Sequence, residues 1–399
     1  MKVLFLGGIF PEGQEAEILN NTKCAVDYAA NNFQKKLLKG LAQTGIDYEV
    51  ISAPFIGAFP HQYKQIKYEG YISQDKNIKY VPFNNIFALR NFSRAKNVKK
   101  NLQSFIRDKE KEKLIIIYSA HTPFLKAAAY AKRKDRNIKI CNIIPDLPQY
   151  MNLNKKKSVL YRIGKRIDIK TFQKFMLHID SYMFLTEHMA TKLDVRNRPV
   201  LVREGIIGDI KDIIQNNNLD FLVNAKKNIV YTGTLNLKYG IKELIDAFIS
   251  LKNPDYRLII CGKGDGEYYV KEKAIGDTRI EYKGQVSSMQ AKEWVNRADV
   301  LVNPRQNNEE YTKYSFPSKN IEYLISGKPV VAYMLDGMKD IYQEFLIIPK
   351  NNSLQALAES IEVALTREYS NDKFVEYCKA NLLARNIINK IIEISYAEN

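Results

Sequence analysis

The sequence has few cysteines and no long apolar run, and each shortage excludes a class of protein. Its four cysteines, Cys24, Cys141, Cys261 and Cys378, form no CxxC pair. This argues against a disulfide framework and a zinc site, and it predicts a reducing, cytoplasmic compartment. No stretch approaches the roughly 18 apolar residues of a membrane span. The first apolar run, VLFLGGIF, is followed by Pro-Glu-Gly-Gln-Glu, a poor cleavage region for a signal peptide.

Negative charge is also in short supply. Against 61 lysines and arginines stand 44 aspartates and glutamates, which gives a net charge of +17. Such an excess attracts phosphate groups, whether in nucleic acid, anionic lipid or a nucleotide. The alternative is that it reflects only a general richness in lysine, asparagine and isoleucine. With 45% hydrophobic and 26% charged residues, the composition is that of a soluble globular protein.

Short apolar runs alternate with segments of helical period along most of the chain. The first series is KVLFL, EVISA, LIIIY, IKICNII, SYMFL and PVLVR, and the second is NIVYTG, YRLIICG, RIEYKG, ADVLVN and PVVAY. Nearly continuous apolar strands of this kind indicate parallel sheets covered on both faces. At 399 residues the chain is too long for one ordinary core. We expect two doubly wound α/β domains, at residues 1–205 and 224–382, joined by a linker at 206–223.

Glycines follow the strands of the second series. Gly233 comes after the first of these strands, Gly262, Gly264 and Gly266 after the second, and Gly284 after the third. In open parallel sheets, ligands bind outside the carboxyl ends of the strands. Glycines there let a ligand approach the backbone, although each of them alone is also typical of an ordinary turn. Together they favour a nucleotide site.

The segment KYSFPSKNIEYLISGKPVV predicts a short helix between two strands. Ser315 or Phe316 suits the N-cap, Pro317 suits the first turn, and Gly327 with Pro329 ends the helix. The free N–H groups and the positive dipole end of such a helix suit a phosphate.

The spacing places Ser318, Lys319 and Glu322 on one face of this helix, with Ile321, Leu324 and Ile325 toward the sheet. A hydroxyl and an ammonium near the N-terminus, with a carboxylate one turn deeper, suit a nucleoside diphosphate. The phosphates would lie at the helix start, and the carboxylate would accept from the ribose hydroxyls. The alternative is an ordinary surface ion pair worth a few tenths of a kcal/mol.

These residues resemble the donor-binding segment of family 4 glycosyltransferases, which are retaining enzymes of the GT-B fold. The likeness extends over nearly the whole chain in the family's usual order: NNFQKKLLKGL, IIPDLPQYM, FLTEHMATKL, VREGII, YTGTLNLKYGIKELIDAF, IICGKGDG and ADVLVNPR. The PSK variant is similar to enzymes of capsule, O-antigen and related surface polysaccharide synthesis.

The resemblance implies two Rossmann-like domains facing an interdomain cleft. The first domain would bind the acceptor, the second would bind the nucleotide sugar, and a C-terminal helix at about 383–399 would pack back on the first. The implied activity is a hexosyltransferase that uses a nucleotide sugar, expected to be UDP-linked, with no tightly bound cofactor and no required metal. Retention in this family is thought to need no covalent intermediate, because the leaving diphosphate assists the incoming hydroxyl on the same face.

For the donor, the resemblance places Glu322 on the ribose. Where the family has an earlier glutamate and two diphosphate-clamping basic residues, this chain has Tyr314, Thr234 and Tyr239. We therefore expect Lys319, Arg305 and Lys238 to compensate the diphosphate charge. The expected donor-binding residues are Gly233, Thr234, Lys238, Gly262, Gly264, Gln285, Val286, Ser315, Ser318, Lys319 and Glu322.

In the first domain, Pro145 stands where the family often has a histidine, and Asp146 follows it. Asp146 would orient the donor sugar or the acceptor hydroxyl, the alternative being a helix cap. His121 also follows a strand and is the second candidate, the alternative being a structural histidine. Asp146, His121, Lys319 and Arg305 are thus the expected catalytic residues. On the acceptor side, Gly7 and Gly8 match the family's first loop, and Asn32 matches a position on the next helix.

Two segments concentrate the positive charge. NKKKSVLYRIGKRIDIK, at 154–170, has seven basic residues and one acidic residue, with Leu160, Ile163 and Ile167 at helical spacing, and residues 90–109 show a weaker version. A basic amphipathic helix is typical of an anionic membrane surface, the alternative being a solvated face. A polyprenyl-diphosphate-linked glycan acceptor at the inner face of the cell membrane would explain both the positive charge of these segments and their location in the first domain.

Two rival functions remain open at this point. An enzyme of the same fold acting on nucleic acid would use the charge differently, but no recognisable nucleic-acid module is present. A nucleotide-sugar epimerase of this fold would need no acceptor.

Overall fold

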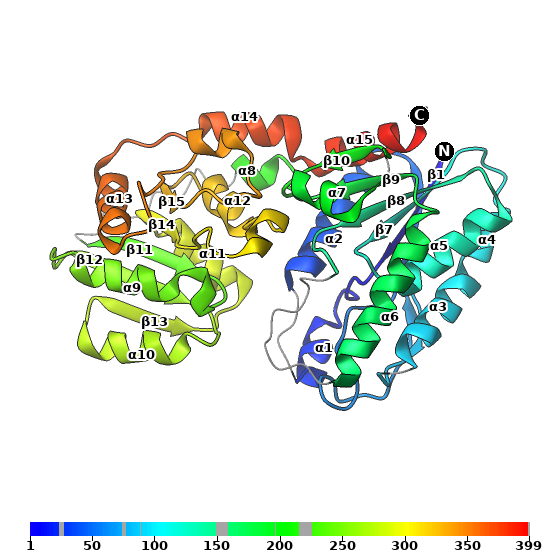
Figure 1. Cartoon of the computed structure of the whole chain (residues 1–399), viewed down its shortest axis with the longest axis horizontal. Coiled ribbons are helices and arrows are strands. Elements are labelled where there is room, and N and C mark those ends of the chain that lie inside the picture. The colour runs from blue at the N-terminus through cyan, green and yellow to red at the C-terminus, as the bar shows by residue number, and fades with distance from the viewer. Residues whose placement is uncertain are drawn as a thin grey trace. The chain divides into compact units, whose positions relative to one another are not determined.

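The computed structural model describes residues 1–23, 28–73, 77–87, 89–148, 159–195, 197–214 and 226–397. The chain divides into two compact units (Figure 1). Unit 1 comprises Met1–Gly208 and Asn381–Asn399, and unit 2 comprises Asp209–Ala380. Parts of the predicted linker and of the predicted basic helix, at 215–223 and 154–158, lie outside the described residues.

Unit 1 is built on an eight-stranded sheet in the order β10-β9-β8-β7-β1-β2-β5-β4. Its strands are β1 (Lys2–Gly7), β2 (Asp47–Ser52), β4 (Tyr71–Ile72), β5 (Ile78–Tyr80), β7 (Lys113–Tyr118), β8 (Ile138–Ile144), β9 (Ser181–Phe184) and β10 (Val200–Val202). All neighbours pair in parallel except β4 and β5. The central strands are buried on both faces, which explains their nearly continuous apolar sequences.

Unit 1 also contains several helices. They are α1 (Glu15–Asn21), α2 (Tyr28–Ala42), α3 (Arg90–Asn101), α4 (Gln103–Arg107), α5 (Thr122–Lys134), α6 (Val159–Met176), α7 (Glu187–Leu193) and α15 (Ala384–Tyr396). The C-terminal helix α15 packs against α2 and contacts β8, β9 and β10, and its apolar residues join a core cluster with β1 and β7. A small antiparallel ribbon of β3 (Lys67–Tyr68) and β6 (Phe83–Asn84) is inserted after β2, and it was not predicted from the sequence.

Unit 2 is built on a five-stranded parallel sheet in the order β13-β12-β11-β14-β15. Its strands are β11 (Lys227–Thr232), β12 (Tyr256–Cys261), β13 (Ile280–Gly284), β14 (Val300–Asn303) and β15 (Val330–Ala332). Its helices are α8 (Lys211–Ile214), α9 (Ile241–Ser250), α10 (Glu267–Gly276), α11 (Ser288–Asn296), α12 (Ser318–Ile325), α13 (Leu354–Thr366) and α14 (Asp372–Asn381), with 3₁₀ turns at η2 (Leu237–Tyr239), η3 (Glu310–Tyr314) and η4 (Asp340–Glu344).

One face of this sheet is covered by α9, α10 and α13, whose apolar residues form a cluster with Ile229, Leu258 and Val302. Side chains alternate along a strand, so Thr232 and Asn303 point to the other face, where α12 packs. The prediction of an α/β protein with parallel sheets is thus confirmed.

Candidate active site

Buried polar contacts fix α12 on the sheet of unit 2. The Tyr323 hydroxyl accepts from the backbone N–H of Thr232 at 2.8 Å and donates to its carbonyl oxygen at 3.1 Å. The Asn303 amide donates to Asn320 Oδ1 at 2.6 Å, and both side chains are buried. Because these bonds occupy the inner face of α12, the orientation of its outer face is set. These anchoring contacts were not predicted from the sequence, in which their only sign is a tyrosine and two asparagines at positions that face the core.

The outer face of α12 carries Ser318, Lys319 and Glu322. The Lys319 ammonium lies 2.6 Å from Glu322 Oε2, with 37% and 53% of the two side chains exposed. Burial disfavours the charged ammonium, but the neighbouring carboxylate outweighs it, so the pKa of Lys319 lies above its ordinary value. The ion pair foreseen as the alternative therefore exists, and it holds two of the proposed ligand groups on one exposed face.

The start of α12 differs from the prediction. The helix begins at Ser318 with Pro317 at its N-cap, and no side chain caps it. The predicted N-cap at Ser315 or Phe316 was wrong because both precede the first helical turn. Phe316 is instead buried against Tyr342, with ring centroids 5.1 Å apart. The backbone N–H of Asn320 donates to the Pro317 carbonyl at 2.8 Å, which leaves the N–H groups of Ser318 and Lys319 without a partner among the described residues.

Removing the Tyr323 hydroxyl should loosen this anchor. In Tyr323→Phe the Thr232 N–H and carbonyl lose their buried partner, so we expect unfolding to become easier by about 1–3 kcal/mol. Chemical denaturation of the full chain measures this. The control is Tyr268→Phe, because Tyr268 is 79% exposed on α10 and should tolerate the change. Equal stability of the two variants would show that the Tyr323 contact contributes nothing.

The glycines after the strands serve the packing of loops on one another. Gly262 has a φ of 143°, and a Cβ there would overlap the carbonyl oxygen of Gly233. A Cβ on Gly264 would lie 2.3 Å from the carbonyl oxygen of Leu235. The Gly262 N–H donates to the Gly284 carbonyl at 2.7 Å, which joins the loops after β12 and β13. Close approach of backbone to backbone is thus enough to require these glycines, without reference to a ligand.

The predicted cations near α12 differ in their availability. Lys238 is paired with Glu309, with Nζ and Oε1 2.6 Å apart. The Arg305 guanidinium lies over the rings of Tyr239 and Tyr311, 5.2 and 4.8 Å from their centroids. Its Nη2 donates to Ser315 Oγ at 2.7 Å, and its buried Nε has no partner among the described residues.

Among the described residues no carboxylate forms an ion pair with Arg305, so its charge is compensated less than that of Lys238. The ring of Tyr239 is one of the two that lie against the Arg305 guanidinium. Ser315 and Arg305 are therefore brought together, whereas Lys238 turns to an acidic partner.

The remaining predicted donor residues line the ends of strands. Thr234 is exposed, and its carbonyl accepts from the Tyr231 hydroxyl at 2.8 Å. Gln285 is exposed and Val286 half-buried, just before the capping box of α11 at Ser287. Tyr314 ends η3 and is half-buried. All of them lie on loops that follow the carboxyl ends of β11, β13 and β14.

In unit 1, the loop after β1 is held by α2. The Gly8 N–H donates to Gln34 Oε1 at 2.8 Å, and the Phe10 N–H donates to Asn31 Oδ1 at 2.9 Å. A Cβ on Gly7 would meet Gln34, and one on Gly8 would meet the Phe55 ring. The predicted Asn32 is exposed on the same helix. Within α2, the side chains that bond to this loop are therefore Asn31 and Gln34 rather than the predicted Asn32.

His121 lies at the start of α5, after β7. Its ring packs against Phe55 and Phe124, with centroids 5.2 and 4.4 Å away. Ser119, two residues before it, has a left-handed φ of 67°, and its carbonyl accepts from the buried Asn142 amide at 3.0 Å. A strained, tethered turn of this kind is more frequent at functional sites than elsewhere. Asp146, two residues after β8, is exposed.

The His121 imidazole is kept neutral. Burial, and then the positive charges of Arg94 and Arg90, hold its pKa well below the ordinary value. Its Nδ1 is buried and has no partner among the described residues.

This burial predicts a pH dependence of stability. Because the folded state disfavours protonated His121, the unfolded chain binds more protons below the ordinary histidine pKa of about 6.5, and stability falls as pH falls through that range. In His121→Phe this contribution, at most about 1.4 kcal/mol per pH unit, should disappear. Denaturation midpoints between pH 7.5 and 5.5 give the slopes, and identical slopes for the two proteins would contradict the expectation.

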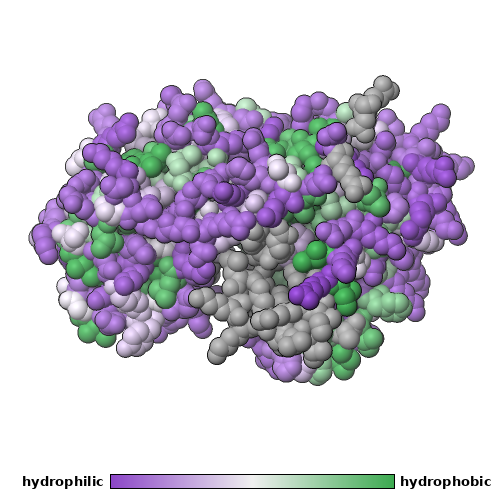
Figure 2. All heavy atoms as spheres, viewed as in Figure 1, coloured by the Kyte–Doolittle hydropathy of each residue, from purple (hydrophilic) through white to green (hydrophobic). Residues whose placement is uncertain are grey.

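The basic segments are only partly surface features. Residues 159–170 of the predicted basic helix belong to α6, where Ile167 is 60% exposed. In α3, however, Arg94 is buried, donates to the Pro54 carbonyl at 2.7 Å and lies over the Phe83 ring. Counting it toward a charged surface was wrong. Hydrophilic residues cover most of the face seen in Figure 2.

Within the described ranges, no helix has the length and apolar character needed to cross a bilayer. In the same part of the chain, no cluster of three or more His, Cys, Asp or Glu residues could hold a metal ion.

Part of the chain matches the model of a known protein family. Residues 215–381 match the family model described as "Glycosyl transferases group 1". The match covers less than half of the chain but most of unit 2. A search of curated proteins found no match to the sequence.

Solved structures resemble the whole chain at low sequence identity. The lipopolysaccharide outer core galactosyltransferase WaaB has a TM-score of 0.59 at 14% identity, over 98% of this chain and 99% of its own. A variant of S. aureus TarM, in complex with fondaparinux, alpha-GlcNAc-glycerol and UDP, has a TM-score of 0.59 at 11% sequence identity, and the match covers 100% of both chains. Anabaena HepE in complex with UDP has a TM-score of 0.54 at 16% sequence identity, over 99% of this chain and 97% of its own. The two-domain α/β fold is therefore that of GT-B glycosyltransferases, and with the family match it supports a transferase enzyme.

Proposed function

We propose that this chain transfers a sugar from a UDP-sugar to a glycan acceptor, with retention of configuration, as a family 4 glycosyltransferase does. The observation that carries the proposal is the outer face of α12. It holds Ser318, Lys319 and Glu322 exposed beside an uncapped helix N-terminus, within the unit that matches the glycosyltransferase group 1 model. WaaB, TarM and HepE, which share the fold, support a sugar-transferring activity, and the last two were solved with UDP.

On this proposal, the two members of the Lys319–Glu322 ion pair bind different parts of the donor nucleotide: Lys319 binds the diphosphate and Glu322 binds the ribose. The ammonium and the backbone N–H groups of Ser318 and Lys319 balance the diphosphate, whose negative charge grows as the sugar leaves. The carboxylate accepts hydrogen bonds from the ribose hydroxyls. Arg305, which has a buried Nε without a partner among the described residues, supplies the second positive charge.

Unit 1 supplies the acceptor side of the reaction. His121 and Asp146, at the ends of β7 and β8, would align the donor sugar and the incoming hydroxyl, with the loop at Gly7 and Gly8 beside them. A neutral imidazole can accept a hydrogen bond from a sugar hydroxyl, which a protonated one cannot. The leaving diphosphate would receive the proton of the acceptor hydroxyl on the same face of the sugar. Charge stabilisation and alignment are then the main tasks of the protein.

The proposed acceptor is a glycan on a polyprenyl diphosphate, in the synthesis of a bacterial surface polysaccharide such as capsule or O-antigen. The positive charge of the chain supports this, together with the exposed Ile167 among the basic residues of α6. The protein would then work at the inner face of the cell membrane as a peripheral enzyme.

Binding of UDP, GDP and ADP to the full chain tests the proposal. We expect UDP to raise the melting temperature more than the other two, because a ligand stabilises the state it binds. Incubation with UDP-sugars, with and without lipid extract, then separates the activities. Transfer that requires the lipid supports the proposal. Isomerised nucleotide sugar without an acceptor would indicate an epimerase, and dependence on DNA would indicate a nucleic-acid enzyme. Equal shifts with all three nucleotides, or none, would refute a UDP-sugar donor.

A further inference from the structure

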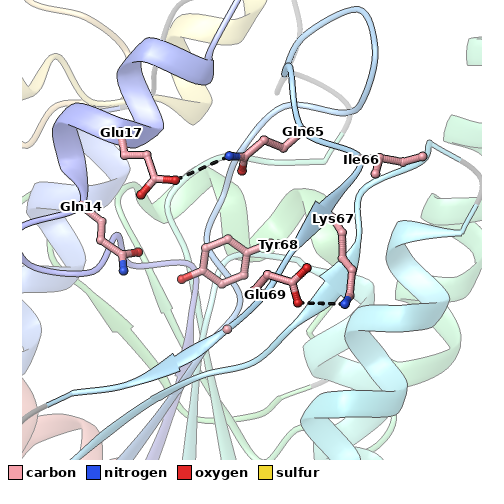
Figure 3. A pocket seen from close by; sticks show the side chains of 8 residues that line it. Gln14, Glu17, Gln65, Ile66, Lys67, Tyr68 and Glu69 are labelled. Atoms are coloured by element: carbon pink, nitrogen blue, oxygen red, sulfur yellow. Dashed lines mark hydrogen bonds and ion pairs between the residues drawn. The ribbon is translucent and has the colours of Figure 1, made fainter.

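Unit 1 contains a pocket of about 460 Å³ between α1 and strand β3. Gln14, just before α1, and Glu17 within it line one side (Figure 3). Gln65, Lys67, Tyr68 and Glu69, from β3 and its flanks, line the other. None of these residues belongs to the site described above.

The two sides of the pocket are joined by backbone and side-chain bonds. The Lys64 N–H donates to the Asn21 carbonyl at 2.8 Å, and the Lys23 N–H donates to the Gln62 carbonyl at 2.9 Å. Gln65 Nε2 reaches Glu17 Oε1 at 3.5 Å, at the weak end of hydrogen bonding. These bonds hold together the two segments, distant in sequence, between which the pocket lies.

Tyr68 gives the pocket an unsatisfied polar group. The residue is 8% exposed and its ring stacks on Phe83, with centroids 5.3 Å apart. Its hydroxyl is buried and has no hydrogen-bond partner among the described residues. Figure 3 shows the hydroxyl directed toward Gln14, on the side away from Glu69. Buried hydroxyls in folded proteins are normally bonded, so a partner is expected here.

The pocket is acidic on a strongly basic protein. Among the described residues that line the pocket, Lys67 is the one cation, and it is paired with Glu69 at 2.8 Å rather than with Glu17. Phosphates, nucleic acids and anionic lipids are thus disfavoured at this place. Carboxylates accept hydrogen bonds, carboxamides donate and accept, and a phenol does both. This set suits a ligand with many hydroxyl groups that carries no negative charge.

We propose that this pocket is a subsite for a neutral or amine-bearing sugar unit of the acceptor glycan. The assignment to the acceptor rests on the proposed function. The volume lies within the range of about 300–1,000 Å³ of small-molecule sites. The pocket also lies on the segment that runs from the loop at Gly7 and Gly8 into α1, and that loop is the expected acceptor side. The diphosphate end of a lipid-linked acceptor would bind elsewhere.

Saturation-transfer NMR on the full chain tests the proposal with four probes: glucose, N-acetylglucosamine, glucosamine and glucose 1-phosphate. We expect at least one of the three sugars without phosphate to bind, with glucose 1-phosphate weaker. Gln14→Ala and Tyr68→Phe should each weaken that binding about 5- to 10-fold, since each removes one hydrogen-bonding group. Tyr71→Phe is the matched control, because Tyr71 is a more exposed tyrosine of the neighbouring strand β4. It should leave binding unchanged.

UDP binding, measured on the same samples, keeps this proposal separate from the donor site. If sugars bind and respond to Gln14→Ala while UDP fails to bind, the pocket stands as a sugar site and the donor proposal fails. Three results would overturn the pocket: no sugar binds, glucose 1-phosphate binds as tightly as glucose, or Tyr71→Phe weakens binding as much as Tyr68→Phe. Gln14 is half-buried and its side chain makes no capping hydrogen bond to α1, so a folding defect in its variant is not expected.

Discussion

Lys319→Ala is expected to lower kcat/KM for the UDP-sugar about 100-fold or more. The ammonium is the charge that α12 presents nearest to its own N-terminus, and removing one group that stabilises developing negative charge typically costs this much. The loss should also appear in UDP affinity, because the diphosphate is already charged before transfer. Calorimetric titration with UDP and steady-state kinetics measure the two effects.

The matched control for this variant is Lys328→Ala. Lys328 follows Gly327 at the other end of the same helix, so its removal changes the net charge equally but leaves the N-terminal face intact. We expect a change of less than about threefold, from long-range electrostatics alone. If both variants bind UDP equally well, or if Lys319→Ala binds it as tightly as the wild type does, the diphosphate assignment is wrong.

Gly262→Ala is expected to destabilise the chain by about 3 kcal/mol or more, the largest structural effect among these predictions. The new Cβ would overlap the Gly233 carbonyl oxygen, and the φ of 143° is one that other residues rarely adopt. Neither can relax alone, because the Gly262 N–H is bonded to the Gly284 carbonyl and the Gly233 N–H to the Cys261 carbonyl. Chemical denaturation of the full chain measures the change.

Gly276→Ala provides the comparison for this substitution. Gly276 ends α10, and a Cβ there would have nothing within 4 Å. Alanine in a helix is favoured over glycine by up to about 1 kcal/mol, so this variant should be as stable as the wild type or more so. A Gly262→Ala protein of wild-type stability would show that the loops after β11 and β12 can move apart.

The architecture could be predicted because both sheets, apart from the edge pair β4–β5, are parallel and are covered on both faces. Their strands are therefore nearly continuous apolar runs, as in Lys113–Tyr118 and Ile138–Ile144, which few other structures require. The ribbon of β3 and β6 could not be predicted, because strands of two residues carry no periodicity. The pocket beside β3 could not be predicted from the sequence for the same reason.

The site could be predicted only as far as spacing reaches. Helical geometry places Ser318, Lys319 and Glu322 on one face. The same spacing suits both a surface ion pair and a site that binds the diphosphate and the ribose, so the sequence alone does not decide between them. In α2, the hydrophobic periodicity does not predict which of Asn31 and Asn32 faces the loop after β1. In the structure it is Asn31, which accepts a hydrogen bond from the Phe10 N–H. Glycines after strands suggested a ligand, whereas Gly262 and Gly264 are explained by neighbouring carbonyls that belong to other loops.

The most direct test of the donor site compares UDP with 2′-deoxy-UDP on the wild type and on Glu322→Ala. If Glu322 accepts from both ribose hydroxyls, the wild type should bind UDP about tenfold more tightly than the deoxy analogue. Glu322→Ala should bind the two with equal, weaker affinity, since the carboxylate that distinguishes them is gone. A preference for UDP that persists in Glu322→Ala, or a wild type with no preference, would contradict the placement of the ribose on α12.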